Sequence, residues 1–195
     1  MADFENVPDE ELARQSQAGS LVAFEELVRR FEHRIYAFVF QSCRNGADAS
    51  DLTQETFVRA FQAMAQFDPR QAFAPWLFTI ARRKCIDFFR ARRPLPMPEE
   101  MDAHDPSDVL SEREESGSVW NLARRILPEA QYQAVWLHYA QDLKVREIAP
   151  ILSKSPTHIK VMLLRARHAL AAKLRAARSE HETAPSAIIA KGESV

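Results

Sequence analysis

The amino-acid sequence predicts an all-α protein: two small helical domains joined by a flexible acidic, proline-rich linker, the second domain containing a helix-turn-helix. Apolar residues recur at offsets of three and four along most of the chain, which is the spacing of amphipathic helices. The alternation of period two that marks strands never persists, and only four glycines occur. Both observations argue against strands.

The composition is typical of a folded protein that does not insert into a membrane. Hydrophobic residues make up 46% of the chain and charged residues 27%. No apolar stretch approaches the roughly 18 to 20 residues that a spanning helix needs, so we expect a cytoplasmic protein. Cys43 and Cys85 are the only cysteines, which predicts buried free thiols rather than a disulfide framework. Neither a metal site nor a cofactor is predicted, because cysteines and histidines show no paired ligand spacing.

Three helices are expected in the first domain, residues 1–93. Ser20 is a candidate cap for a long helix with a broad apolar stripe, and Asp48 is a candidate cap for the second helix. The third helix is expected from about Ala74 to Arg93. We assign Trp76 on this helix to the core, because aromatic residues at helical spacing are more often buried than used for stacking.

The linker is assigned to residues 94–117, where prolines alternate with acidic residues. The second domain follows at residues 118–177, and Pro128 is expected as the first residue of one of its helices. Helical periodicity fades from residue 178 to 195, which predicts a mobile tail.

A short helix, a tight turn at Ser153 and Lys154, and a long helix capped by Ser155 have the proportions of a helix-turn-helix. Pro150 lies inside the short helix, which we therefore expect to be bent or shortened. By itself this pattern fits a solvated helical bundle as well as a DNA-binding module. The residues expected on the exposed face of the long helix are Thr157, His158, Lys160, Val161, Leu164 and Arg165.

Charge is sorted by segment, although the net charge of the whole chain is only −1. Two basic blocks lie on either side of the acidic linker, and clustered Lys and Arg favour contact with nucleic acid. The first block comprises Arg70, Arg82, Arg83, Lys84, Arg90, Arg92 and Arg93, and the second comprises Lys154, Lys160, Arg165, Arg167, Lys173 and Arg175.

Motifs in both domains resemble those of the sigma-70 family of RNA polymerase sigma factors. The segments similar to the family's second conserved region are Asp51-Leu52-Thr53-Gln54-Glu55-Thr56-Phe57, Pro75-Trp76-Leu77 and Ile80-Ala81-Arg82. Those similar to its fourth conserved region are Leu127-Pro128-Glu129, Arg146-Glu147-Ile148-Ala149 and Leu163-Leu164-Arg165-Ala166-Arg167. A linker stands in place of the third region, which is the arrangement of the extracytoplasmic-function (ECF) group.

The resemblance implies contacts of the first domain with polymerase and with the minus-ten element. In the family, the helix that here carries Asp51, Gln54 and Glu55 docks on the clamp helices of the largest polymerase subunit. The loop that follows captures a flipped base of the non-template strand, and the next helix holds phosphates. Asp87 is expected to pair with a neighbouring arginine, with base reading as the alternative. The candidates are Arg70, Gln71 and Phe73 for the base, and Arg82, Arg83, Lys84 and Arg90 for the phosphates.

For the second domain the resemblance implies binding of the minus-thirty-five element through the six exposed residues of the long helix. Two departures from the family pattern concern this module. Ser153 stands where the family usually has Gly, and Val161, Met162 and Leu164 stand where polar residues are usual. Apolar side chains can contact thymine methyls but donate no hydrogen bonds to bases.

The predicted function is that of an ECF sigma factor, which gives core RNA polymerase its promoter specificity, begins DNA melting and catalyses nothing itself. Core polymerase and promoter DNA are the expected partners, and family habit adds an anti-sigma factor. One alternative is a helix-turn-helix regulator that works without polymerase; the acidic face at Asp51 to Glu55 argues against it. The other is a sigma-like adaptor or decoy acting through protein contacts, which the apolar face from Val161 to Leu164 keeps open.

Overall fold

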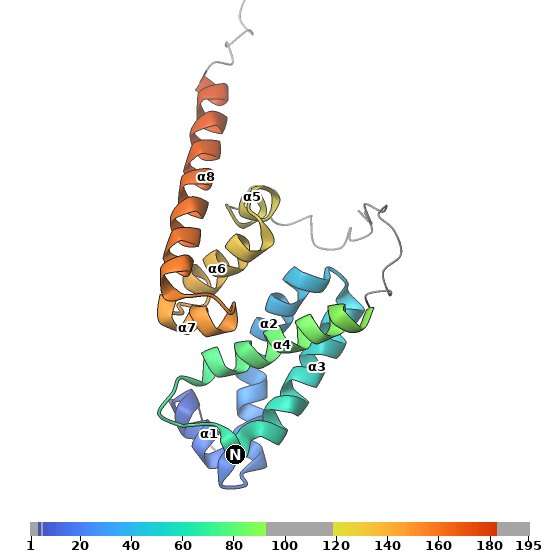
Figure 1. Ribbon diagram of the computed structural model, residues 1–195. Helices are drawn as coiled ribbons and strands as arrows, with labels where there is room; N and C mark the ends of the chain where they lie inside the picture. The colour runs from blue at the N-terminus through green and yellow to red at the C-terminus, as the bar shows by residue number, and fades with distance from the viewer. Residues whose placement is uncertain (1–3, 5, 93–118, 183–195) are drawn as a thin grey trace, which may run out of the picture.

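Helices form all the regular structure that the computed structural model describes, which covers residues 4, 6–92 and 119–182, with side chains up to residue 176 (Figure 1). The prediction of an all-α fold is therefore confirmed for these residues. The linker predicted at residues 94–117 and residues 183–195 of the predicted tail lie outside them.

The first group of helices begins with a short helix that the sequence did not predict. Gly19 separates this helix from the next with a φ of +97°, a conformation that suits a residue without a Cβ. Ser20 then caps the long helix as predicted, since its Oγ accepts a hydrogen bond from the N–H of Ala23 at 3.3 Å. The elements are α1 (Asp9–Gln17), α2 (Leu21–Cys43), α3 (Gly46–Ala63), the 3-10 turn Met64–Gln66 and α4 (Phe73–Arg92).

The turn between α2 and α3 corrects the predicted cap. Asn45, and not Asp48, caps α3: the Asn45 Oδ1 accepts a hydrogen bond from the N–H of Asp48 at 3.0 Å. Arg44 ends α2 in the left-handed region, with a φ of 50°. Asp48 instead forms an ion pair with Arg92 of α4, in which Nη1 of Arg92 lies 2.8 Å from Oδ2 of Asp48.

Four phenylalanines that are fully buried form the centre of the first group, and they come from α2 and α4. Phe31 meets Phe73, and Phe38 meets Phe78, each pair edge to face with ring centroids 5.3 Å apart. This packing holds α4 across α2, and so fixes the position of every side chain on the outer face of α4.

The second group contains the predicted helix-turn-helix, formed by α7 and α8. Pro128 precedes α6 as its N-cap rather than being its first residue. Ser155 caps α8 as predicted, because its Oγ accepts a hydrogen bond from the N–H of His158 at 3.1 Å. The elements are α5 (Val119–Ile126), α6 (Glu129–Tyr139), α7 (Val145–Ile151) and α8 (Pro156–Glu182). Thus α8 continues past residue 178, where the tail was expected to start.

The turn between α7 and α8 has Ser153 at the position where glycine is usual in the family. Ser153 occupies the left-handed region, with a φ of 52°. Pro150 lies in the last turn of α7, which is only seven residues long. The short length of α7 confirms the prediction of a bent or shortened helix in its second form. Because Pro150 lies near the end of α7, its missing N–H costs the helix few hydrogen bonds.

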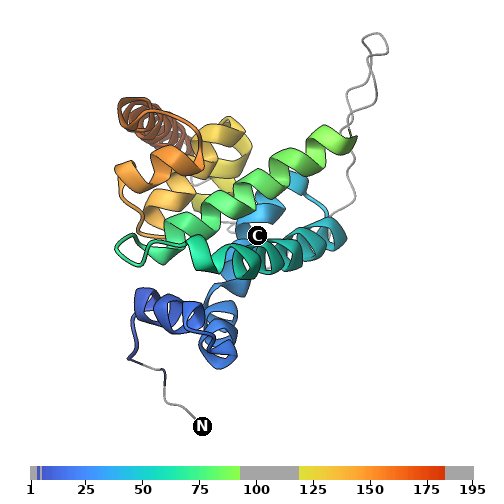
Figure 2. The ribbon, with the colours of Figure 1, turned by 60° about the horizontal axis from the view of Figure 1, so that its bottom comes forward.

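The two groups pack against each other: α7 lies along α4, and α6 contacts α2 (Figures 1 and 2). One continuous cluster of buried apolar residues runs through both groups. This contact was not predicted, because apolar periodicity assigns buried residues to each helix but does not indicate which domain covers them.

Candidate functional site

The three residues predicted to dock on polymerase share one exposed face of α3, which we call the docking face: Asp51, Gln54 and Glu55. Leu52 and Phe57 occupy the opposite, buried side of the helix, so the amphipathic pattern of α3 turns the polar groups outward. A shallow groove beside the docking face is lined further by Val58, Arg59, Gln62 and Lys84.

An ion pair joins the docking face to α4. Nζ of Lys84 lies 2.9 Å from Oε2 of Glu55, and both side chains remain partly exposed. Lys84 had been predicted to hold a DNA phosphate and Glu55 to bind polymerase. The structure therefore brings the two predicted surfaces into direct contact, over a separation of 29 residues in the chain that no local pattern encodes.

The loop between the 3-10 turn and α4 presents Arg70 and Gln71 to solvent. Asp68 accepts hydrogen bonds from both the backbone N–H and the guanidinium of Arg70. The side-chain hydrogen bond from Arg70 lowers the pKa of the Asp68 carboxyl, and Asp68 in turn raises the pKa of Arg70. This local pairing orders the loop.

Phe73 is a correction to the predicted site. Its side chain is fully buried at the start of α4, where the ring meets those of Phe31, Phe67 and Trp76 at centroid distances of 5.3, 5.7 and 5.6 Å. A ring held inside the core cannot stack on a base without unfolding the start of α4. Trp76 itself packs on Phe67 at 5.0 Å, which confirms its assignment to the core.

The basic residues of α4 form a strip, and some of them already pair with carboxylates: Lys84 pairs with Glu55, and Arg90 pairs with Asp87. Arg90 lies 3.8 Å from Asp87, the pairing that the sequence favoured. Arg83 is exposed, and no described carboxylate pairs with it. The strip consists of Arg82, Arg83, Lys84, Asp87 and Arg90.

Two neighbours of this strip, Arg92 and Phe89, were not among the predicted site residues. Arg92 forms a bidentate pair with Asp48 at 2.8 and 3.0 Å, and its guanidinium lies 4.1 Å from the centroid of the Phe88 ring. Phe89 is 45% exposed, and its ring meets that of Phe88 with centroids 5.3 Å apart. An exposed aromatic ring on a basic helix is suited to stacking on an unpaired base. Helical spacing alone does not distinguish Phe89 from the more deeply buried phenylalanines of α4.

All six residues predicted on the recognition helix are exposed on α8: Thr157, His158, Lys160, Val161, Leu164 and Arg165. Met162 is buried, in contrast to the sequence reading, which grouped it with Val161 and Leu164. The apolar part of the exposed face is therefore limited to Val161 and Leu164, which are 39% and 46% exposed.

Neither a metal centre nor a membrane span is found in the part of the chain that the structure describes. No group of His, Cys, Asp or Glu side chains among these residues is placed to hold a metal ion. No described helix is both long enough and apolar enough to cross a bilayer. Cys43 and Cys85 are both free thiols, and burial raises the pKa of Cys85 to about 12.

Comparison with known proteins gives the family. Residues 27–94 match the model of Sigma-70 region 2, and residues 125–170 match that of Sigma-70, region 4. The ECF RNA polymerase sigma factor BldN of Streptomyces coelicolor is 32% identical in an alignment of 178 positions that covers 87% of this chain and 67% of BldN. The chain is an ECF sigma factor of the sigma-70 family.

Other relatives of this sigma factor agree with that membership. The ECF sigma factor SigW of Bacillus subtilis is 28% identical over 177 residues, covering 83% of this chain and 94% of SigW. The structure of CnrH, solved in complex with the cytosolic domain of CnrY, superposes with a TM-score of 0.61 at 27% identity, over 86% of this chain and 97% of CnrH. In our sigma factor, the docking face and the basic strip lie within the region 2 match, and the exposed face of α8 lies within the region 4 match.

Proposed function

We propose that this ECF sigma factor binds core RNA polymerase through the docking face, and promoter DNA through the basic strip and α8. The observation that carries the proposal is the juxtaposition in region 2. An acidic and amide face on α3 lies directly beside a cationic strip on α4, joined at Glu55 and Lys84. One small domain thus offers a surface suited to a protein and another suited to nucleic acid.

In this proposal the residues of the basic strip have different tasks. Arg83 and Arg90 hold backbone phosphates, while Arg70 and Gln71 contact the unpaired base of the minus-ten element. Phe89, rather than the buried Phe73, is an aromatic ring of α4 that is exposed for stacking. The six exposed residues of α8 bind the minus-thirty-five element in the major groove.

The partners follow from the same family membership. The protein acts in the cytoplasm with core polymerase, as an initiation factor without a catalytic site of its own. An anti-sigma factor is a further proposed partner. The similarity to CnrH supports binding of a protein partner of this kind, because the structure of CnrH was solved in complex with the cytosolic domain of CnrY.

In vitro transcription on fragmented genomic DNA tests the proposal, with purified core polymerase in the presence and absence of the protein and with sequencing of the RNA starts. We expect starts that require the protein and share two spaced upstream motifs. Binding to core without such starts would contradict promoter recognition and would favour an adaptor or decoy.

A further inference from the structure

Two buried phenylalanines close the foot of the loop that we propose to contact an unpaired base. Phe67 precedes this loop and Phe73 follows it, and their ring centroids lie 5.7 Å apart. We call the segment between them, residues 68–72, the base loop. Within it, the carbonyl of Asp68 accepts a hydrogen bond from the N–H of Gln71 at 2.9 Å, which makes a tight turn. The base loop thus projects from the core with both of its ends fixed.

A side chain of α1 holds the beginning of the base loop. Nε2 of Gln17 donates hydrogen bonds to the carbonyl oxygen of Met64 at 2.8 Å and to that of Phe67 at 2.6 Å. Carbonyl groups at the end of a helix lack some of their helical partners, and one amide nitrogen has two hydrogens to donate. Gln17 therefore binds the backbone at the point where the 3-10 turn ends and the base loop begins.

A second side chain of α1 holds the other end of the base loop. Oε1 of Glu10 accepts a hydrogen bond from the backbone N–H of Phe73, the first residue of α4, at 3.1 Å. The first N–H groups of a helix lack intrahelical acceptors and carry partial positive charge, so a carboxylate from another helix can cap α4. Glu10 and Gln17 are seven residues apart, about two turns of α1, and lie on the same side of that helix. One side of α1 thus contacts both ends of the base loop.

Helix α1 is itself anchored to α2 by Arg30. Nη1 of Arg30 donates hydrogen bonds to the carbonyl of Val7 at 2.8 Å and to Oδ1 of Asp9 at 2.7 Å. Nε of the same guanidinium donates to Oε1 of Glu26 on α2 at 2.7 Å, which fixes its orientation. Leu12 is fully buried and adds apolar packing. The start of α1 is therefore held in place, next to the residue that caps α4.

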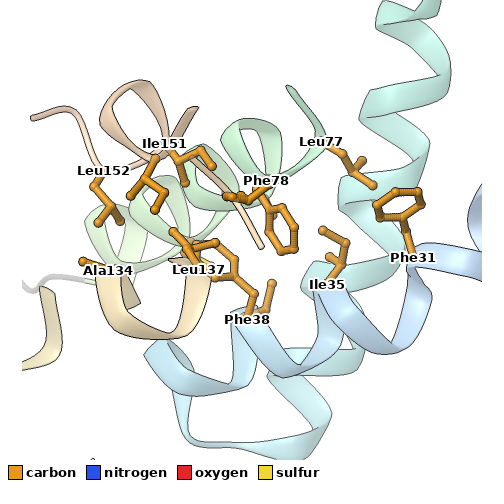
Figure 3. Packing of buried hydrophobic residues seen from close by; sticks show 14 of the residues in the cluster. Phe31, Ile35, Phe38, Leu77, Phe78, Ala134, Leu137, Ile151 and Leu152 are labelled. Atoms are coloured by element: carbon orange, nitrogen blue, oxygen red, sulfur yellow. The ribbon is translucent and has the colours of Figure 1, made fainter. Parts of the chain in front are cut away.

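The apolar packing that places α4 does not involve Glu10 or Gln17. The Phe73 ring meets that of Phe31 on α2, with centroids 5.3 Å apart, and Figure 3 shows Leu77 of α4 pointing toward the Phe31 ring. All three apolar side chains are fully buried. Loss of a hydrogen bond from α1 should therefore loosen the base loop without displacing α4.

We infer that α1 is a positioning element for base capture, in which Gln17 and Glu10 hold the base loop in the shape that receives the unpaired base. The inference rests on the proposed function, in which Arg70 and Gln71 of this loop contact that base. A loop that is ordered beforehand loses less conformational entropy when it binds. Affinity and base discrimination therefore both depend on the anchors of the loop, although neither anchor needs to contact DNA.

Binding of the holoenzyme to single-stranded promoter DNA tests the inference. The DNA carries the minus-ten element found by sequencing the RNA starts, either intact or with an abasic site at one position at a time. For the native protein we expect one abasic position to weaken binding most, because the captured base is missing there. Gln17→Leu should bind the intact strand about three- to tenfold more weakly. It should also lose most of the dependence on that base, while the slope of log affinity against log salt concentration stays unchanged.

Gln15→Leu is the matched control, because the Gln15 amide donates to Oε1 of Glu11 within α1, at 3.0 Å, rather than to the base loop. It should retain the native dependence on the captured base. Should Gln17→Leu prove unfolded by circular dichroism, Glu10→Ala and Glu10→Gln take its place. The alanine variant removes the acceptor for the N–H of Phe73, whereas the amide oxygen of the glutamine variant keeps it. Glu10→Gln should therefore restore the base dependence that Glu10→Ala loses.

Hydrogen exchange in the free protein gives a readout that needs neither polymerase nor DNA. Faster exchange of residues 68–73 in Gln17→Leu than in Gln15→Leu supports the anchoring of the base loop, and equal exchange overturns it. An equal loss of affinity for intact and abasic strands in Gln17→Leu, or no loss, overturns the inference and leaves the proposed function intact. A native holoenzyme for which no abasic site matters contradicts base capture itself, and the inference then fails together with that part of the proposed function.

Discussion

Lys84 and Glu55 lie 2.9 Å apart, so that a residue proposed to bind DNA and a residue proposed to bind polymerase neutralise each other in the free protein. Exposed ion pairs of this kind contribute little to stability, about 0 to 1 kcal/mol. The pair is therefore easily exchanged for partners in a complex. If Glu55 contacts polymerase as proposed, Lys84 is released to attract phosphate, and we expect assembly of the holoenzyme to favour DNA binding.

Reversing the charge of Glu55 should separate folding from docking. We expect Glu55→Lys to weaken binding to core polymerase by at least about tenfold, because it reverses the charge of a carboxylate that we propose to contact polymerase. Far-ultraviolet circular dichroism should remain unchanged, since the side chain is 56% exposed. Glu32→Lys makes the same change on the exposed surface of α2 and should bind normally. Equal affinities of the two variants in a pull-down would refute the assignment of the docking face.

Arg83 should contribute to promoter binding through its charge alone. We expect Arg83→Gln to reduce the slope of log affinity against log salt concentration by about 1, with little change in the preferred sequence. Binding of the holoenzyme to a labelled promoter across a salt series measures this slope. Arg14→Gln, which removes a charge from α1, serves as the control. A slope that does not change would exclude a phosphate contact at Arg83.

Leu164 is expected to recognise thymine methyl groups in the minus-thirty-five element. Replacing the thymines of that element by uracil removes only methyl groups, and should weaken binding by about fourfold for each methyl contacted. The effect should disappear in Leu164→Ala. Competition binding between the thymine-containing and the uracil-containing DNA gives the ratio of their affinities directly. An equal loss of affinity on uracil substitution in the native protein and in Leu164→Ala would show that Leu164 does not carry the contact.

Substitutions at the two serines in the turn of the helix-turn-helix should change the stability of the fold in opposite directions. Ser153→Gly should stabilise the fold by about 0.5 to 1 kcal/mol, because glycine adopts a φ of 52° without steric cost. Ser155→Ala should destabilise it by about 1 kcal/mol, because the cap of α8 is lost. Thermal unfolding of the full chain measures both shifts, and a rise for the second variant would exclude the capping role.

Cys85 should make the protein less stable at alkaline pH. Burial raises the pKa of its thiol from 9.0 to about 12 in the folded state, so the unfolded chain releases this proton first. The free energy of unfolding is therefore unaffected by Cys85 below about pH 9, and decreases as pH rises from 9 towards 12. Urea unfolding at pH 7 and pH 10 measures the decrease, which should be smaller in Cys85→Ala. Iodoacetamide should label Cys85 only after unfolding.

Much of the fold could be predicted from the sequence because local patterns encode it. Apolar periodicity located the long helices, and the capping chemistry of Ser20 and Ser155 fixed where two of them begin. The prediction failed at Asp48, where Asn45 offered an equally good cap three residues earlier. Helix α1 was missed because its apolar face is small, comprising Leu12 and Ala13.

The candidate site was less predictable, because exposure depends on tertiary packing. Phe73 and Phe89 have the same side chain and lie on the same helix, yet one is buried and the other exposed. The pairs Glu55–Lys84 and Asp48–Arg92 join residues far apart in the chain. The contact of Trp136 with Phe38 and Phe78 was equally invisible, since a tryptophan at helical spacing fits the core of its own domain.

The position of Phe78 also has a consequence for the order in which the chain folds on the ribosome. Synthesis proceeds from the N-terminus, and domains generally fold as they emerge. Helix α4 is therefore complete before α6 and α7 exist to cover Phe78 and Phe38. During that interval the nascent first domain exposes an apolar surface to which chaperones can bind. Packing of α6 against α2 and of α7 against α4 then covers this surface.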